Sequence, residues 1–86
     1  MSDARALAEI KRLARLGRVV FPAHALERMD ERGAEPGDVI RALLTAFSAT
    51  RQSNHRWCVE GGIDRVGDDL TVIVAIEADL IVITVF

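Results

Sequence analysis

Three side chains of types that handle phosphate groups, His24, Arg28 and Arg32, recur every four residues in the sequence. In a helix this spacing places all three along one side. Arginine offers a planar fork of donors that matches phosphate oxygens, and histidine can take up or release a proton near neutrality. One imidazole and two guanidinium groups are a sufficient set for metal-free cleavage of an RNA phosphodiester. The histidine would move a proton, and the arginines would stabilise charge in the transition state.

The same residues also have structural interpretations. Glu27 and Glu31 lie at ion-pair spacing from the two arginines, so all four side chains can form solvated pairs on an ordinary helix. His24 can equally cap its helix or pack beneath a strand. A third interpretation is a small domain whose arginines hold phosphate without catalysis, and nothing in the sequence separates it from a ribonuclease.

The helix that would carry these residues is predicted over Ala23–Arg32. Pro22 suits the first turn of a helix, and Gly33 suits its end because glycine takes the left-handed conformation without strain. The β-branched and aromatic run Arg18–Phe21 is predicted as a short strand or extended lead-in. Free backbone N–H groups at the start of this helix would favour an anion beside His24.

Two further helices and a series of strands complete the prediction. One helix spans Asp3–Leu16 with Asp3 as its cap, and another begins at Pro36. The buried stripe of the latter is predicted to comprise Val39, Ile40, Leu43, Leu44 and Phe47. The strands are predicted at Ala49–Gln52, Arg56–Glu60, Ile63–Val66, Leu70–Glu77 and Leu80–Val85. This order predicts one α+β domain over residues 1–86, with N-terminal helices packed on one face of a C-terminal antiparallel β-meander whose last two strands are central.

Composition limits the classes of function. Cys58 is the only cysteine, so no disulfide or cysteine-pair zinc site can form within the chain, and no motif predicts a metal or cofactor. No segment has the pattern of a signal peptide or membrane span, so we expect a soluble, cytoplasmic protein without a membrane partner. The net charge of −2 argues against general attraction to nucleic acid but is compatible with a specific RNA site.

The segment from Phe21 to Gly33 resembles the DUF4258 family. The resemblance lies in three short motifs, His24-Ala25, Arg28-Met29 and Glu31-Arg32-Gly33. Two later blocks of the family follow in order, a strand around Trp57–Gly61 and an apolar ending like Ile81–Val85. The resemblance covers about residues 18–86 and leaves residues 1–17 as an extra N-terminal helix.

This resemblance implies a fold similar to the RelE and BrnT bacterial toxins. It also implies an mRNA interferase-like endoribonuclease, the toxin of a type II toxin–antitoxin module, with a cognate antitoxin and RNA or the ribosome as partners. His24, Arg28 and Arg32 match the family's positions as the catalytic set, and Thr84 in the C-terminal block would line the same cleft.

Three more residues are weaker candidates for binding RNA or phosphate. Arg51 and Arg56 flank a predicted hairpin turn and could extend a basic rim, although solvated charges at strand ends explain them as well. Trp57 could stack on a base, but its alternation with Val59 also fits a core or interface position.

The alternative function is a non-catalytic module that binds a protein partner or forms a homodimer. Residues 1–17 suggest it, because they lie outside the family-like segment. Beyond its apolar stripe, the helix predicted there carries Arg5, Lys11, Arg12 and Arg15.

Overall fold

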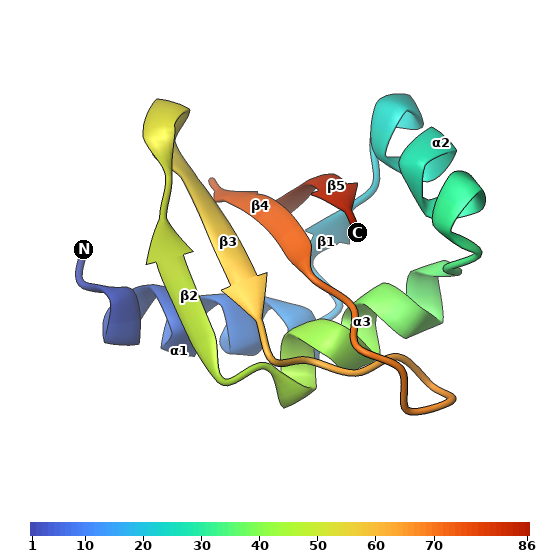
Figure 1. Ribbon diagram of the computed structural model, residues 1–86. Coiled ribbons are helices and arrows are strands. Elements are labelled where there is room, and N and C mark those ends of the chain that lie inside the picture. Colours follow the sequence, from blue (N-terminus) through green and yellow to red (C-terminus); the bar gives the residue numbers. More distant parts are fainter.

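The computed structural model describes residues 1–86 as three helices and a five-stranded sheet (Figure 1). The helices are α1 (Asp3–Arg15), α2 (Ala23–Arg32) and α3 (Pro36–Thr45). The strands are β1 (Val19–Val20), β2 (Ser48–Arg51), β3 (Arg56–Glu60), β4 (Val72–Ile76) and β5 (Leu80–Val85), and the 3-10 turn η1 (Ser53–His55) joins β2 to β3. The prediction of an α+β fold with helices before the strands is confirmed. None of the helices has the length and apolar character needed to cross a membrane.

The sheet has the order β1-β5-β4-β3-β2. Strands β2 to β5 form the predicted antiparallel meander, and β4 and β5 are inner strands of the whole sheet, as expected from their apolar sequences. The short run after α1 is a true strand, because Val19 and Val20 pair in parallel with Leu80 and Ile81 of β5. The sheet is therefore mixed.

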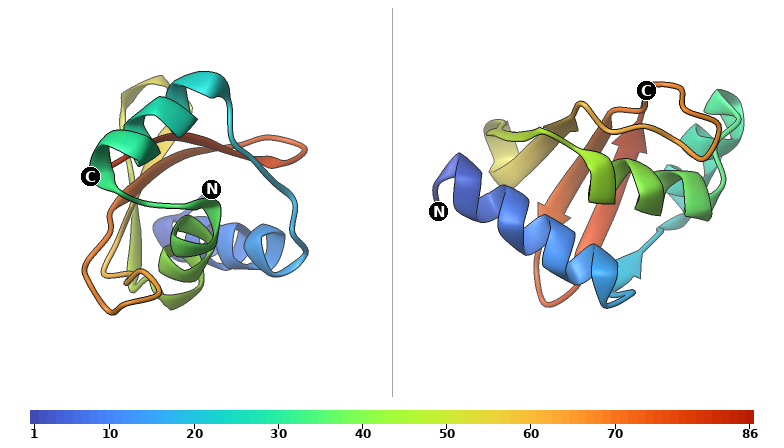
Figure 2. Two further views of the ribbon diagram at one scale, coloured as in Figure 1. Left: turned by 90° about the vertical axis from the view of Figure 1, so that its right-hand side faces the viewer. Right: turned by 90° about the horizontal axis from the view of Figure 1, so that it is seen from below.

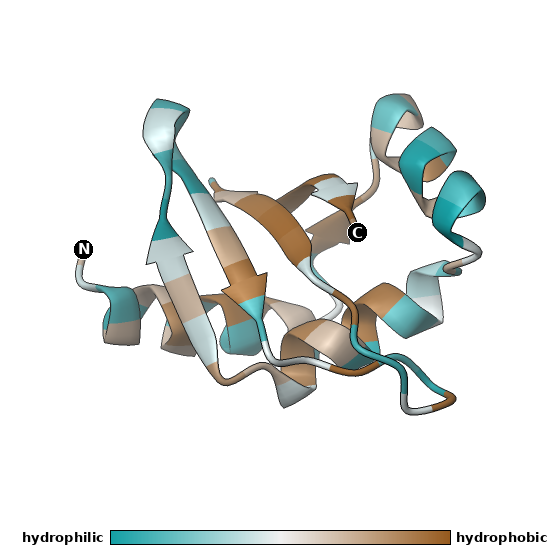
Figure 3. Ribbon diagram, viewed as in Figure 1, coloured by the Kyte–Doolittle hydropathy of each residue, from teal (hydrophilic) through white to brown (hydrophobic).

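The hydrophobic core lies between the sheet and the pair α1 and α3, which both pack below it in Figure 1 (Figures 1 and 2). The central strands are the most apolar part of the sheet (Figure 3). The side chains that fill the core are almost fully buried. They include Ile10 and Leu13 of α1, Val39 and Leu43 of α3, and Val59, Val72, Val74, Leu80 and Val82 of the sheet.

Helix α2 packs elsewhere. Its Ala25 and Met29 are buried and belong to the core cluster, and its main contacts are with β5. Because β1 pairs with only the first two residues of β5, the rest of that edge is free for α2 to cover. The left view of Figure 2 shows the sheet passing between α2 and the α1–α3 pair. Two of the three helices thus lie on one face of the sheet, and α2 lies on the opposite side, along β5.

The prediction of a strand over Ile63–Val66 is wrong. This segment is a loop in which only Ile63 forms a bridge, with Asp69. The Asp64 carboxylate accepts hydrogen bonds from the backbone N–H groups of Val66 and Asp68, at 3.0 and 2.9 Å. A side chain that binds its own backbone in this way favours a turn over a strand.

Two predicted features of the helices also differ. The N-cap of α1 is Ser2 and not Asp3, since the Ser2 hydroxyl accepts the N–H of Arg5 at 3.2 Å. Phe47 is outside the core, with 85% of its surface exposed, because α3 ends at Thr45 and Ala46 is extended. The helical spacing that would bury Phe47 therefore stops two residues before it.

One charged cluster holds the loop after β3 against α3. Asp38 accepts the backbone N–H of Glu35 at 2.9 Å, completing a capping box, and accepts the backbone N–H and Nε of Arg65 at 3.1 and 3.0 Å. The pKa of the Asp38 carboxyl is held well below its ordinary range, first by the Arg65 side chain and then by these backbone donors. The ionised form is thus favoured in the folded protein.

Asp38→Asn is therefore expected to lower stability at neutral pH. Because the folded-state pKa is depressed, the stabilisation from Asp38 is fully present above the unfolded pKa of about 4 and is lost as the pH falls below it. Urea unfolding of both proteins between neutral and acidic pH checks this. The difference in unfolding free energy should shrink on acidification, and a constant difference would contradict the assignment.

Candidate functional site on helix α2

The exposed side of α2 carries the predicted catalytic set. His24, Arg28 and Arg32 are all exposed and follow one flank of the stripe that buries Ala25 and Met29. Pro22 precedes the helix without a side-chain capping hydrogen bond, so the N–H groups of the first turn remain free for an anion near His24. The set has the linear arrangement that its spacing predicts.

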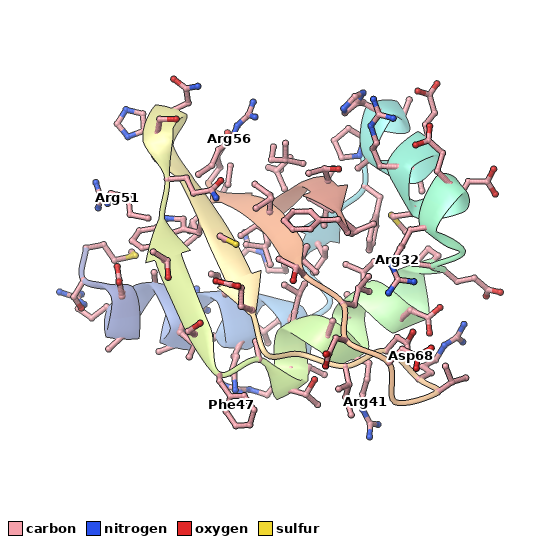
Figure 4. The ribbon with its side chains drawn as sticks, viewed as in Figure 1. Arg32, Arg41, Phe47, Arg51, Arg56 and Asp68 are labelled. Atoms are coloured by element: carbon pink, nitrogen blue, oxygen red, sulfur yellow. The ribbon has the colours of Figure 1, made fainter.

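Each arginine has a contact within the protein. Arg28 pairs with Glu31 at 2.8 and 3.0 Å, and both side chains are exposed. Arg32 donates to the carbonyl oxygen of Asp69 at 2.8 Å, and Figure 4 shows it extending from α2 toward the loop before β4. The exposed His24 side chain forms no ion pair and no hydrogen bond within the protein. Exposed pairs of this kind contribute little to stability, so a phosphate can compete for the guanidinium groups.

The face of the sheet opposite α1 and α3, which α2 flanks along β5, presents two rows of side chains. Arg56 of β3 pairs with Ala75 of β4, Ala75 with Ile81 of β5, and Ile81 with Val20 of β1. Paired residues share a face, so this row runs across four strands and ends at Val20, just before α2 begins. Arg56 is exposed and enters no ion pair.

The second row joins Cys58 of β3, Ile73 of β4 and Thr84 of β5. Cys58 and Ile73 are buried, and Thr84 is half-buried. Burial, together with the neighbouring Glu60 carboxylate, raises the pKa of the Cys58 thiol, which keeps it in the unreactive thiol form. Thr84 and Arg56 therefore lie on the same face of the sheet, opposite α1 and α3.

Arg51 and Trp57 lie on the other face. Trp57 alternates with Arg56 along β3 and is only 5% exposed, under the Arg51 guanidinium at 5.0 Å from the ring centroid. Arg51 also donates to the carbonyl oxygen of Met1 at 3.2 Å. Figure 4 shows Arg51 and Arg56 extending to opposite sides of the β2–β3 hairpin. The four weaker candidates are thus divided, and only Arg56 and Thr84 face the side of the sheet that α2 flanks.

The period of two along a strand is the signal that separates Arg56 from Trp57. This alternation holds only within one strand. It does not predict whether Arg51 and Arg56 share a face, because a turn of irregular geometry lies between them. Asn54 and His55 in that turn both have positive φ. The cross-strand register then decides which face each arginine takes.

Three surface pockets, of about 310, 190 and 230 Å³, lie along α1 and the β2–β3 hairpin, and none borders α2. The third lies between α1 and β2, beside the exposed ring of Phe47. No group of three histidine, cysteine or acidic side chains is arranged to hold a metal ion.

Comparison with known proteins gives one match. Residues 21–86 match the family model of DUF4258, described as a domain of unknown function. No curated protein and no solved structure matches the chain. The matched segment includes α2, α3 and strands β2 to β5, and it excludes α1 and β1.

Proposed function

The chain belongs to the DUF4258 family, and we propose that it cleaves RNA phosphodiester bonds without a metal, as the toxin of a type II toxin–antitoxin module. The observation that carries the proposal is the single exposed flank of α2 with His24, Arg28 and Arg32. None of the three is used to build the core.

In this mechanism the substrate supplies its own nucleophile. The 2′-oxygen of a ribose attacks the neighbouring phosphorus as His24 takes the 2′-hydroxyl proton, and the bond from phosphorus to the 5′-oxygen breaks. The products are a 2′,3′-cyclic phosphate and a 5′-hydroxyl group, whose proton comes from a water molecule, and His24 returns its own proton to solvent. Arg28 and Arg32 stabilise the extra negative charge on the phosphate oxygens in the transition state.

The start of α2 supports the role of His24. A phosphate near the first turn would meet free backbone N–H groups and the positive end of the helix dipole. It would also draw Arg28 away from Glu31, because a dianionic transition state attracts a guanidinium more strongly than one exposed carboxylate. The binding of the phosphate and the stabilisation of its transition-state charge would then increase together.

The test compares the two histidines of the chain. His24→Asn is expected to lower the rate of RNA cleavage by the purified protein about 10²- to 10⁴-fold, the usual contribution of a general acid or base. His55→Asn is the matched control, because His55 is exposed in the η1 turn, away from α2, and asparagine tolerates its positive φ. Circular dichroism verifies that both variants are folded.

Growth on induction of each protein in bacteria provides a second readout. Arrest by the parent and by His55→Asn, but not by His24→Asn, supports a toxin whose chemistry depends on α2. Equal activity of all three would remove the catalytic assignment of His24. No cleavage and no arrest by any of the three would make the non-catalytic interaction module the better proposal, since the exposed Phe47 beside the α1–β2 pocket favours it.

A further inference from the structure

We infer that the substrate strand is single-stranded and lies across the sheet face opposite α1 and α3, along the row Arg56, Ala75, Ile81 and Val20, with Arg56 holding a phosphate at the end opposite His24. This inference rests on the proposed function for the nature of the ligand. Its geometry comes from the strand register.

The row leads from Arg56 toward α2. Neighbouring strands lie about 4.8 Å apart, so the three spacings from β3 to β1 cover about 14 Å. Val20 ends the row, and His24 follows it by four residues in the first turn of α2. A nucleic-acid strand that follows the row therefore passes from the Arg56 guanidinium at one end to the segment that leads into α2 at the other.

The floor of this path is apolar. Ala75 and Ile81 are half-buried, and Val20 is 40% exposed. In a single strand the base faces are free to lie on such a surface, whereas in a duplex they are stacked inside the helix. A duplex would offer this floor only its phosphates and sugars, which gain little from apolar contact. The floor thus favours an unpaired strand.

The charges at the Arg56 end of the path favour a polyanion. Arg56 enters no ion pair, and the hairpin from Ala49 to Val59 contains no carboxylate. Glu60 shares the face with Arg56 but lies four residues along β3, about 13 Å away. Negative charge is therefore attracted to the Arg56 end of the face and repelled at the Glu60 end. A polyanion is thus expected to bind along the row through Arg56 and not along the row through Cys58.

The chain offers a matched pair of arginines for the test. Arg51 and Arg56 belong to the same hairpin and are both exposed, but Arg51 faces α1 and stacks on Trp57. Arg51→Gln and Arg56→Gln change the net charge equally. The probe is a fluorescein-labelled single-stranded RNA with methylated 2′-oxygens, which cannot be cleaved. Its affinity is measured by fluorescence anisotropy over a series of salt concentrations.

Arg56→Gln is expected to raise the Kd for this probe about tenfold and to reduce the slope of log K against log salt by about 0.7, the value for one phosphate contact on a single strand. Arg51→Gln should leave both quantities unchanged. Equal losses in the two variants would overturn the inference, because they would indicate general electrostatic attraction. Equal affinity for an RNA duplex, or no binding by the parent, would overturn it as well.

This binding test is independent of catalysis. Loss of affinity in Arg56→Gln, together with no cleavage by the parent protein, would retain the path and remove the proposed ribonuclease. Cleavage that needs His24 but proceeds normally in Arg56→Gln, with unchanged binding, would retain the ribonuclease and remove the path.

Discussion

Gly62→Ala is expected to destabilise the fold by about 3 kcal/mol, at the upper end of the usual cost of overpacking. A methyl group on Gly62 would overlap the carbonyl oxygen of Ala42 and lie 2.7 Å from its carbonyl carbon and 2.9 Å from its Cα. These are backbone atoms of α3, so no side-chain rotation relieves the clash. For a domain with a total stability of about 5–15 kcal/mol, the loss is large.

Neither side of this contact can move away easily. The carbonyl oxygen of Gly62 accepts the N–H of Leu70 at 3.0 Å, and the N–H of Ile63 donates to the Thr45 hydroxyl at 2.9 Å. Ala42 itself is buried in the core. The loop and α3 are therefore held together on both sides of Gly62, and the substitution must distort one of them.

Urea unfolding followed by circular dichroism measures the loss. Gly33→Ala is the control, because Gly33 has a φ of +76° and open space around its Cβ position. It should cost only the conformational penalty of about 1–2 kcal/mol for a left-handed residue. If Gly62→Ala costs no more than Gly33→Ala, the close approach of the loop to α3 is wrong.

Ile10→Ala is expected to cost about 3–4 kcal/mol, as is typical of a large aliphatic side chain removed from a closed core. Ile10 has no exposed surface and lies on the buried side of α1 with Ala6, Leu13 and Ala14. Helix α1 lies outside the segment that matches the family. The prediction therefore asks whether this helix is an appendage or part of the core.

The control for Ile10 is Leu16→Ala, since Leu16 is 59% exposed at the end of the same helix. It should change the unfolding free energy by about 0.5 kcal/mol or less. A similarly small effect of Ile10→Ala would mean that α1 detaches without loss of the core. The expected large effect would mean that a truncated chain without α1 is unsuitable for tests of function.

The sequence alone determined the local features of this protein. Helical spacing located α2 and placed His24, Arg28 and Arg32 on one side of it, because i, i+4 neighbours share a face in any helix. The apolar runs of β4 and β5 likewise indicated inner strands, since only burial on both faces rewards such composition. Where a local interaction opposed the pattern, prediction failed. The Asp64 carboxylate turned a predicted strand into a loop, and the end of α3 at Thr45 left Phe47 exposed.

Only the tertiary structure decided how these elements meet. No periodicity within β2 or β3 states that Arg51 and Trp57 face α1 while Arg56 and Thr84 face the other side, because the cross-strand register and the irregular η1 turn set those faces. The pairing of Val20 with Ile81 aligned the Arg56 row with the start of α2. These contacts join residues up to 61 positions apart, and their geometry depends on the packing of the whole core, which local spacing does not encode.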